Sequence, residues 1–246
     1  METTTTLPEQ LEEDSKDEET TLSEQLEKCL KDKDIKHYDF PRSENFRIIG
    51  KGGFAVVYLA TFEEEQYALK SFQQNLHFDK REFKYFMKEL EMLYKLKDHP
   101  NIIKFYGISR NMLEGNVMLV LQYANGGNLR NHLFKKQKNN IYSILWSELI
   151  KIAIDIIKGL KHLHENDIIH RDLHSKNILI NNGNALISDL GISKRIDASI
   201  TSSEFKPRGV VAYTEPQYFI APQYSENSKR DDQEKIQRDK KSDIIA

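Results

Sequence analysis

The chain has 246 residues, of which 39% are hydrophobic and 30% are charged, and its formal net charge is −2. This length and composition are typical of one sizeable globular domain, or of two lobes with a tail. The slightly negative charge argues against a protein that binds nucleic acid or anionic membranes through charge alone.

Apolar runs and cysteine content indicate the cellular compartment in which the chain is expected. No run of about 18 consecutive apolar residues occurs, so no membrane span is expected. Cys29 is the single cysteine and no internal disulfide can form. This suits a cytoplasmic or otherwise intracellular setting, with nuclear access left open.

Residues 1–35 contain twelve Asp or Glu against four Lys, a balance of −8. A segment this acidic and this poor in aromatic residues is typical of disorder. Within it, Leu22, Leu26, Cys29 and Leu30 recur at helical spacing. The segment is therefore expected to be a solvated tail, and a helix that binds a partner remains the alternative.

The next stretch, up to about residue 124, combines several β-type segments with one helical segment. Residues 80–97 are rich in Glu, Lys, Leu and Met at helical spacing and precede His99-Pro100, where proline disfavours further helix. The β-branched and aromatic residues predict strands over residues 46–49, 55–60, 66–72, 102–107 and 117–123.

From about residue 125 the pattern becomes mainly helical. Residues 125–128 are typical of a turn or linker. Residues 146–165 place a stripe of Leu, Ile and Ala on one face of a predicted helix. Two short strands are expected over 177–180 and 185–188, because Asn182-Gly183 between them is a strong hairpin signal.

The β-rich part contains two features suited to phosphate. The segment from Gly50 to Ala55 is rich in glycine, which lets backbone N–H groups approach phosphate oxygens; a hairpin without a ligand is the alternative. Lys70 ends an apolar strand, where it could pair with phosphate oxygens or simply lie on the surface. The next helix offers three glutamates as its partner, and spacing alone does not choose among Glu82, Glu89 and Glu91.

The sharpest signal is the segment from His170 to Asn177. It places Asp172 and Asn177 five residues apart, just before an apolar strand. The carboxylate can accept a proton from an attacking hydroxyl, and the amide oxygen can bind a metal ion. Asp189 follows the next short strand, in Asp-Leu-Gly, where a second carboxylate can bind Mg²⁺.

The order of these pieces matches the protein kinase signature: glycine hairpin, strand lysine, helix glutamate, Asp…Asn loop, and Asp-x-Gly. From about Phe46 to Asp243 the sequence resembles the protein kinase superfamily, and within it the tyrosine-kinase-like group. The resemblance implies an α+β, bilobal fold over residues 36–246. Its small lobe, about residues 46–124, would be β-rich with one regulatory helix, and its large lobe, about residues 125–246, mainly α-helical and incomplete.

The resemblance also implies roles for single residues, with ATP and Mg²⁺ as cofactors. Asp172 would be the catalytic base, assisted by the charge of Lys176. Lys70 would contact the α- and β-phosphates and pair with Glu89, and Asn177 and Asp189 would bind the metal. The residues expected around the nucleotide are Gly50, Lys51, Gly52, Gly53, Ala55, Val57, Ala68, Lys70, Leu121, Gln122, Ala124, Asn128 and Leu179.

By resemblance, the chain is expected to be an ATP-dependent protein kinase of intracellular signalling, directed at Ser/Thr of a protein substrate. No nucleic-acid or membrane partner is expected, and the acidic N-terminal segment is a candidate partner site. Lys70→Met or Asp172→Asn is expected to abolish transfer and leave the fold largely intact.

Residues 239–244 resemble the entry to the central helix of the large lobe. The chain is therefore expected to be truncated there, with weak or absent activity when isolated. The alternative function is a pseudokinase-like module that binds a nucleotide or a partner with little catalysis.

Overall fold

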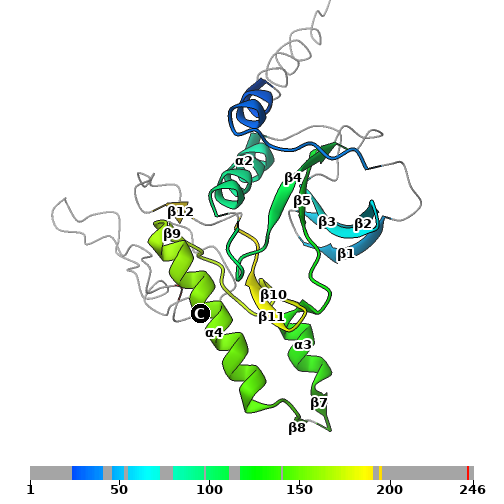
Figure 1. Ribbon diagram of the computed structural model, residues 1–246, viewed down its shortest axis with the longest axis vertical. Coiled ribbons are helices and arrows are strands. Elements are labelled where there is room, and N and C mark those ends of the chain that lie inside the picture. Colours follow the sequence, from blue (N-terminus) through cyan, green and yellow to red (C-terminus); the bar gives the residue numbers. More distant parts are fainter. Residues whose placement is uncertain are drawn as a thin grey trace, which may run out of the picture. The chain divides into compact units, whose positions relative to one another are not determined.

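The computed structural model describes residues 24–40, 46–52, 55–72, 80–96, 98–110, 117–139, 141–190, 194–195 and 243 (Figure 1). The chain divides into two compact units. Unit 1 comprises Met1–Leu90 and Phe105–Tyr123, and unit 2 comprises Glu91–Lys104 and Ala124–Ala246.

The chain is helical over residues 24–32, within the segment whose composition predicts disorder. Leu26 is buried there, with 3% of its surface exposed, so this helix packs against the rest of unit 1. Residues 24–35 therefore differ from the solvated tail that composition predicts, because the apolar face of the helix is buried against other residues. Residues 1–23 of the acidic segment, which as a whole is the candidate partner site, lie outside the described residues.

Unit 1 contains one antiparallel five-stranded sheet, with strand order β1-β2-β3-β5-β4. Its inner positions hold apolar residues such as Leu69 and Val120, neither of which is exposed. The β-branched and aromatic residues of these segments pack well on a pleated surface. The strands are β1 (Arg47–Lys51), β2 (Val56–Phe62), β3 (Glu65–Ser71), β4 (Phe105–Arg110) and β5 (Val117–Gln122).

Helix α2 (Lys80–Lys95) follows the third strand and ends before His99-Pro100, as the sequence predicts. Its buried positions include Phe83, Phe86 and Leu90, which recur at helical spacing. The same buried stripe contains one charged residue, Glu89. A carboxylate in that position requires a partner.

The described part of unit 2 contains two helices and several short strands. The helices are α3 (Leu129–Lys135) and α4 (Trp146–Glu165). The strands are β6 (Gly127–Asn128), β7 (Gln137–Lys138), β8 (Ile141–Tyr142), β9 (Ile168–Ile169), β10 (Ile178–Asn181), β11 (Asn184–Ile187) and β12 (Lys194–Arg195). They form a sheet in the order β11-β10-β6 and two pairs, β12-β9 and β7-β8. The sheet of unit 1 and the helices of unit 2 confirm the predicted α+β class.

Helix α4 has the bounds that the sequence predicts and packs against β11 (Figure 1). Gly159 allows this close approach: a Cβ there would lie 2.7 Å from the Asn101 carbonyl oxygen and 2.8 Å from Ile187 Cδ1. The hairpin of β10 and β11 turns at Asn182-Gly183, as predicted, and both residues have positive φ. This packing fixes the point at which the chain leaves β11 toward Asp189.

Two local predictions need correction. The strand expected over 102–107 begins only at Phe105, because Ile103 N–H donates to the Ile187 carbonyl and Ile187 N–H to the Asn101 carbonyl, both at 2.9 Å. These residues thus bond to β11 of unit 2. The turn expected over 125–128 ends in strand β6, which pairs with β10, and Asn128 then caps α3, an element that the sequence analysis did not predict.

A buried carboxylate ties α4 to β11. Asp155 Oδ2 accepts hydrogen bonds from Lys151 Nζ at 3.0 Å and from Ala185 N–H at 3.1 Å, and 8% of the residue is exposed. Burial by itself would raise the pKa of Asp155. The hydrogen bonds from Ala185 and Lys151 outweigh burial and hold this pKa below its ordinary value.

Asp155→Asn is expected to lower the free energy of unfolding by about 1–3 kcal/mol at pH 7, because a buried acceptor of two hydrogen bonds loses its charge. A carboxyl whose folded pKa is depressed stabilises the fold above its unfolded pKa of about 3.9, and that stabilisation is lost as the pH falls through the folded value. Urea unfolding should therefore show a deficit that is largest near neutrality and shrinks in acid. Glu165→Gln, at an exposed position of the same helix, is the control; a deficit independent of pH would contradict the assignment.

Candidate active site

The candidate residues of unit 1 include one buried ion pair. Lys70, in β3, places its Nζ 2.7 and 2.8 Å from Oε1 and Oε2 of Glu89, in α2. Only 8% of Lys70 and 1% of Glu89 are exposed. The Lys70 ammonium also lies 5.0 Å from the centre of the Phe72 ring. The structure thus selects Glu89 among the glutamates that spacing alone leaves open.

Four further candidates are aligned by the strand register. Val57 lies opposite Lys70, and Ala68 lies opposite Leu121. Cross-strand partners point to the same side of a sheet, as do residues two apart on one strand. Val57, Ala68, Lys70 and Leu121 therefore project from one face of the unit 1 sheet. Gln122, the residue after Leu121, projects from the other face.

The glycine-rich segment forms the turn between β1 and β2. Gly50 and Lys51 are the last residues of β1. Gly52 N–H donates to the Ala55 carbonyl at 2.9 Å, which brings the two ends of the turn together. Gly53, the remaining candidate here, lies outside the described residues.

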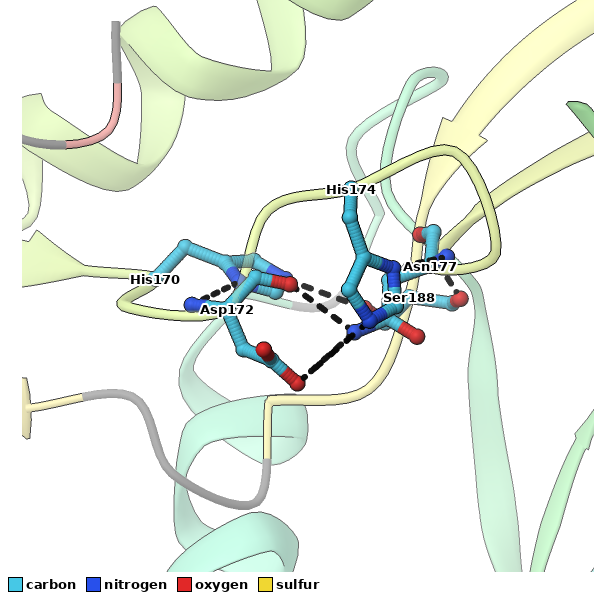
Figure 2. A network of polar contacts seen from close by, with 5 residues as sticks. All are labelled: His170, Asp172, His174, Asn177 and Ser188. Carbon is cyan, nitrogen blue, oxygen red and sulfur yellow. Dashed lines mark hydrogen bonds and ion pairs between the residues drawn. The ribbon is translucent and has the colours of Figure 1, made fainter. Parts of the chain in front are cut away.

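The second group of candidates belongs to unit 2, in the loop between β9 and β10 (Figure 2). Asn177 Nδ2 donates to the Asp172 carbonyl oxygen at 2.9 Å and to Asp172 Oδ2 at 3.2 Å. His174 Nε2 lies 3.8 Å from the same Oδ2. Asp172 N–H in turn faces His170 Nδ1 at 3.3 Å. These contacts orient the Asp172 carboxylate through one of its two oxygens.

The loop is fastened to the end of β11. Ser188 N–H and Ser188 Oγ both donate to the Asn177 carbonyl at 2.9 Å, and His170 Nε2 lies 3.0 Å from the Ser188 carbonyl (Figure 2). Asp189 follows directly and is exposed, with φ +63°. Arg171, beside Asp172, also has positive φ, at +71°. Left-handed backbone is uncommon for residues other than glycine and often accompanies functional sites.

One carboxylate oxygen of this loop accepts no hydrogen bond from the residues that the structure describes. Asp172 Oδ1 is buried and accepts no hydrogen bond within the described part of the chain. The Asn177 amide nitrogen faces Asp172, and its amide oxygen likewise accepts no hydrogen bond from the described residues. Buried polar oxygens are normally satisfied. An unsatisfied carboxylate oxygen and an amide oxygen suit a hydroxyl proton or a hard cation such as Mg²⁺.

The remaining candidates lie nearby in unit 2. Leu179, in β10, is the register partner of Asn128, in β6. The Asn128 side chain accepts a hydrogen bond from Asn131 N–H at 2.9 Å, so it also caps α3. Ala124 is buried, and Lys176 is exposed.

One residue beside this loop, Asp243, is not marked by any motif in the sequence. Asp243 is 2% exposed and accepts hydrogen bonds from His170 N–H at 2.7 Å and Arg171 N–H at 2.9 Å. His164 Nε2 lies 3.0 Å from the same carboxylate. Asp243 is 73 residues from His170, so no local spacing links them. It holds the backbone just before Asp172.

Comparison with known proteins identifies the family of these residues. Residues 43–234 match the protein kinase domain family. The chain is 35% identical over 182 residues to leaf rust 10 disease-resistance locus receptor-like protein kinase-like 1.2 of Arabidopsis thaliana. It is 32% identical over 193 residues to a probable serine/threonine-protein kinase of Dictyostelium discoideum, and 36% identical over 190 residues to a probable LRR receptor-like serine/threonine-protein kinase of Arabidopsis thaliana.

These alignments cover most of the chain but little of each relative. They include 73%, 77% and 72% of this chain, and 27%, 20% and 18% of the respective relatives. The chain therefore spans about a quarter or less of the length of the curated relatives that it matches. Among the described residues, no helix has the length and apolar character needed to cross a membrane.

Proposed function

Because this chain belongs to the protein kinase domain family, we propose that it binds ATP with Mg²⁺ and transfers the γ-phosphate to serine or threonine hydroxyls of a protein substrate. Two of the three relatives described above are named serine/threonine-protein kinases. The structural observation that supports the proposal most strongly is Asp172 Oδ1, which is buried beside Asn177 in the loop after β9 and accepts no hydrogen bond from the residues that the structure describes.

Asp172 is proposed as the base. Asn177 Nδ2 donates to Asp172 Oδ2 at 3.2 Å and His174 Nε2 lies 3.8 Å from the same oxygen, which leaves Oδ1 for the proton of the attacking hydroxyl. The substrate oxygen forms a bond to the γ-phosphorus while the bond between that phosphorus and the oxygen of the leaving ADP breaks, and the hydroxyl proton passes to Oδ1. Lys176, exposed in the same loop, is proposed to balance negative charge at the transferred group.

Lys70 is proposed to hold the α- and β-phosphates. Its ammonium has three donors, and the two Glu89 oxygens fix where it lies. Val57, Ala68 and Leu121 project from the same sheet face as Lys70, which supports an apolar adenine contact on that face. The other residues proposed for nucleotide contact are Gly50, Lys51, Gly52, Gly53, Ala55, Gln122, Ala124, Asn128 and Leu179.

Asn177 and Asp189 are proposed as the Mg²⁺ ligands. Their oxygen donors suit a hard cation, and the Asn177 amide oxygen is not engaged by the described residues. Bound Mg²⁺ would neutralise phosphate charge. Ser188, the residue directly before Asp189, donates two hydrogen bonds to the Asn177 carbonyl, which supports the proposal that Asn177 and Asp189 act on the same ion.

The proposed group within the kinase family rests on sequence features. We propose membership of the tyrosine-kinase-like group, which the sequence resembles from about Phe46 to Asp243. His174 two residues after Asp172, with Lys176 two residues further on, is a layout nearer to that of tyrosine kinases, so the type of hydroxyl that is labelled decides the substrate class. We propose that the reaction takes place inside the cell, where ATP is available, in the cytoplasm or in the nucleus.

The proposal is tested with the purified full chain, γ-labelled ATP, Mg²⁺ and a generic protein substrate such as casein. Label on serine and threonine, absent when Mg²⁺ is chelated, is the expected result. Calorimetric titration with a non-hydrolysable ATP analogue runs in parallel. Nucleotide binding without transfer would identify a binding module, and label on tyrosine alone would overturn the substrate class.

A further inference from the structure

Residues 24–40, the N-terminal strap, lie entirely ahead of the part of the chain that matches the kinase domain family, which begins at residue 43. The strap consists of the helix over 24–32 and an extended stretch up to Phe40. It nevertheless belongs to unit 1. What it contacts there indicates what it does.

The strap bonds to the open edge of the unit 1 sheet. β4 is the last strand in the sheet order, so one of its edges has no strand partner. Ile108 N–H donates to the Lys36 carbonyl at 3.0 Å, and Tyr38 N–H donates to the Ile108 carbonyl at 2.8 Å. An isolated parallel bridge joins His37 to Ile108. Arg110, at the end of β4, forms an ion pair with Glu27 of the strap helix.

Two aromatic residues of the strap cover one face of the sheet. Tyr38 is 7% exposed, and its ring centre lies 5.7 Å from that of Tyr67 in β3 and 6.0 Å from that of Phe62 in β2. The Phe40 ring lies 5.4 Å from Phe62. Ring separations of this size are favourable aromatic contacts. The rings pack with a core cluster that includes Leu69 of β3.

A glycine in β4, Gly107, makes room for the backbone of the strap. A Cβ at Gly107 would overlap the Lys36 carbonyl oxygen, and it would lie 3.0 Å from the Lys36 carbonyl carbon and 3.2 Å from Tyr38 Cε2. The three atoms nearest to a Cβ at position 107 all belong to the strap. The glycine therefore leaves the space in which the strap's backbone lies.

The covered face is the reverse side of the strand that holds Lys70. Side chains alternate along β3, so Tyr67 and Leu69 face the strap, while Ala68 and Lys70 point to the other side. Without the strap, Leu69 and its neighbours would lose the aromatic layer packed against that side of β3, and the strand would be held by its hydrogen bonds to β2 and β5. A shift of β3 moves the Lys70 ammonium relative to Glu89.

We propose that the N-terminal strap is a positioning element of the nucleotide site: docked on β4 and on the aromatic face, it holds β3 so that Lys70 remains paired with Glu89. This inference rests on the proposed function for its consequence in catalysis, and on the contacts above for its structural part.

Three variants of the full chain test the proposal. Tyr38→Ala removes the ring from the aromatic face, and Gly107→Ala closes the space that the strap backbone occupies. The φ of Gly107 is +157°, so Gly107→Ala also strains β4, and agreement with Tyr38→Ala is required. Tyr38→Phe, which keeps the ring and removes only the hydroxyl, is the matched control.

Hydrogen exchange is the first measurement, because it needs no activity. In Tyr38→Ala and Gly107→Ala, amides of residues 35–40 and 105–110 should exchange at least about tenfold faster than in the parent chain. Exchange over residues 65–71 in β3 and 83–90 in α2 should also rise, and Tyr38→Phe should match the parent.

The second measurement is steady-state kinetics, which shows whether the KM for ATP changes more than kcat. It is made at least about 15 °C below the unfolding midpoint of each variant. If the strap positions Lys70, the KM for ATP of Tyr38→Ala and Gly107→Ala should rise about three- to tenfold, because Lys70 is held less firmly in these variants. Fast exchange of the strap with unchanged exchange in β3 and unchanged KM would overturn the proposal and leave the strap a stabilising layer only. If the parent chain binds no nucleotide, the proposed function fails, and the exchange of β3 still decides whether the strap positions it.

Discussion

Asp172→Asn is expected to lower kcat for phosphate transfer by about 10²–10⁴-fold. Asparagine is nearly isosteric with aspartate, but its side chain does not accept the hydroxyl proton. Its oxygen still accepts the hydrogen bond from Asn177 Nδ2, now 3.2 Å from Asp172 Oδ2, so the loop should keep its conformation. The KM for ATP should change little, because Asp172 is proposed to act on the hydroxyl and not on the nucleotide.

The measurement is steady-state transfer to a generic protein substrate, together with the thermal unfolding midpoint. That midpoint should move by less than about 3 °C, which is about 1 kcal/mol for a chain of this size. Asp167→Asn makes the same chemical change five residues earlier, at an exposed position with positive φ that asparagine accommodates. Undiminished transfer by Asp172→Asn would remove Asp172 from the mechanism.

Lys70→Met is expected to abolish nucleotide-dependent transfer and also to destabilise the fold by about 3–5 kcal/mol. The second effect departs from the expectation, based on resemblance alone, that the fold stays largely intact. Its reason is the burial of Glu89, which is 1% exposed and would lose the ammonium 2.7 Å away. Methionine fills the space of the lysine stem but leaves that carboxylate buried without its charge partner.

The double variant Lys70→Met/Glu89→Met separates the two effects. Replacing both members of a buried ion pair with apolar residues of similar volume is often neutral for stability. The double variant should therefore recover most of the unfolding free energy, measured in urea, while transfer remains absent. Lys84→Met, at an exposed position of α2, is the control for loss of a surface charge. Parent-like stability of the single variant would mean that the pair does not form in solution.

Local sequence patterns predicted much of the fold. The bounds of α4 coincide with the predicted helix, and the β10–β11 hairpin turns at Asn182-Gly183. Both rest on short-range physics, since apolar residues at helical spacing and a turn dipeptide act within a few residues. The strand predicted over 102–107 was wrong in its first three residues, because long-range contacts decide their conformation. Their β-type composition was correctly detected, but their hydrogen-bond partners belong to β11, far away in the sequence.

The residue types proposed for chemistry were also visible in the sequence, because each follows a recognisable strand or helix signal. Their partners were not. Glu89 was one of three candidates until packing placed it on the buried side of α2. Asp243 was absent from the candidate set, although it bonds the backbone beside Asp172 from 73 residues away.

The sequence by itself determined the α+β class, the order of the main elements and the chemical types of the candidate residues, because propensity and periodicity are properties of neighbouring residues. Only the tertiary structure decided which glutamate pairs with Lys70, which oxygen of Asp172 accepts a hydrogen bond from Asn177, and that residues 36–38 bond to the edge of β4. These depend on contacts between distant segments, which form only when apolar faces are buried against each other and each buried polar group must find a partner.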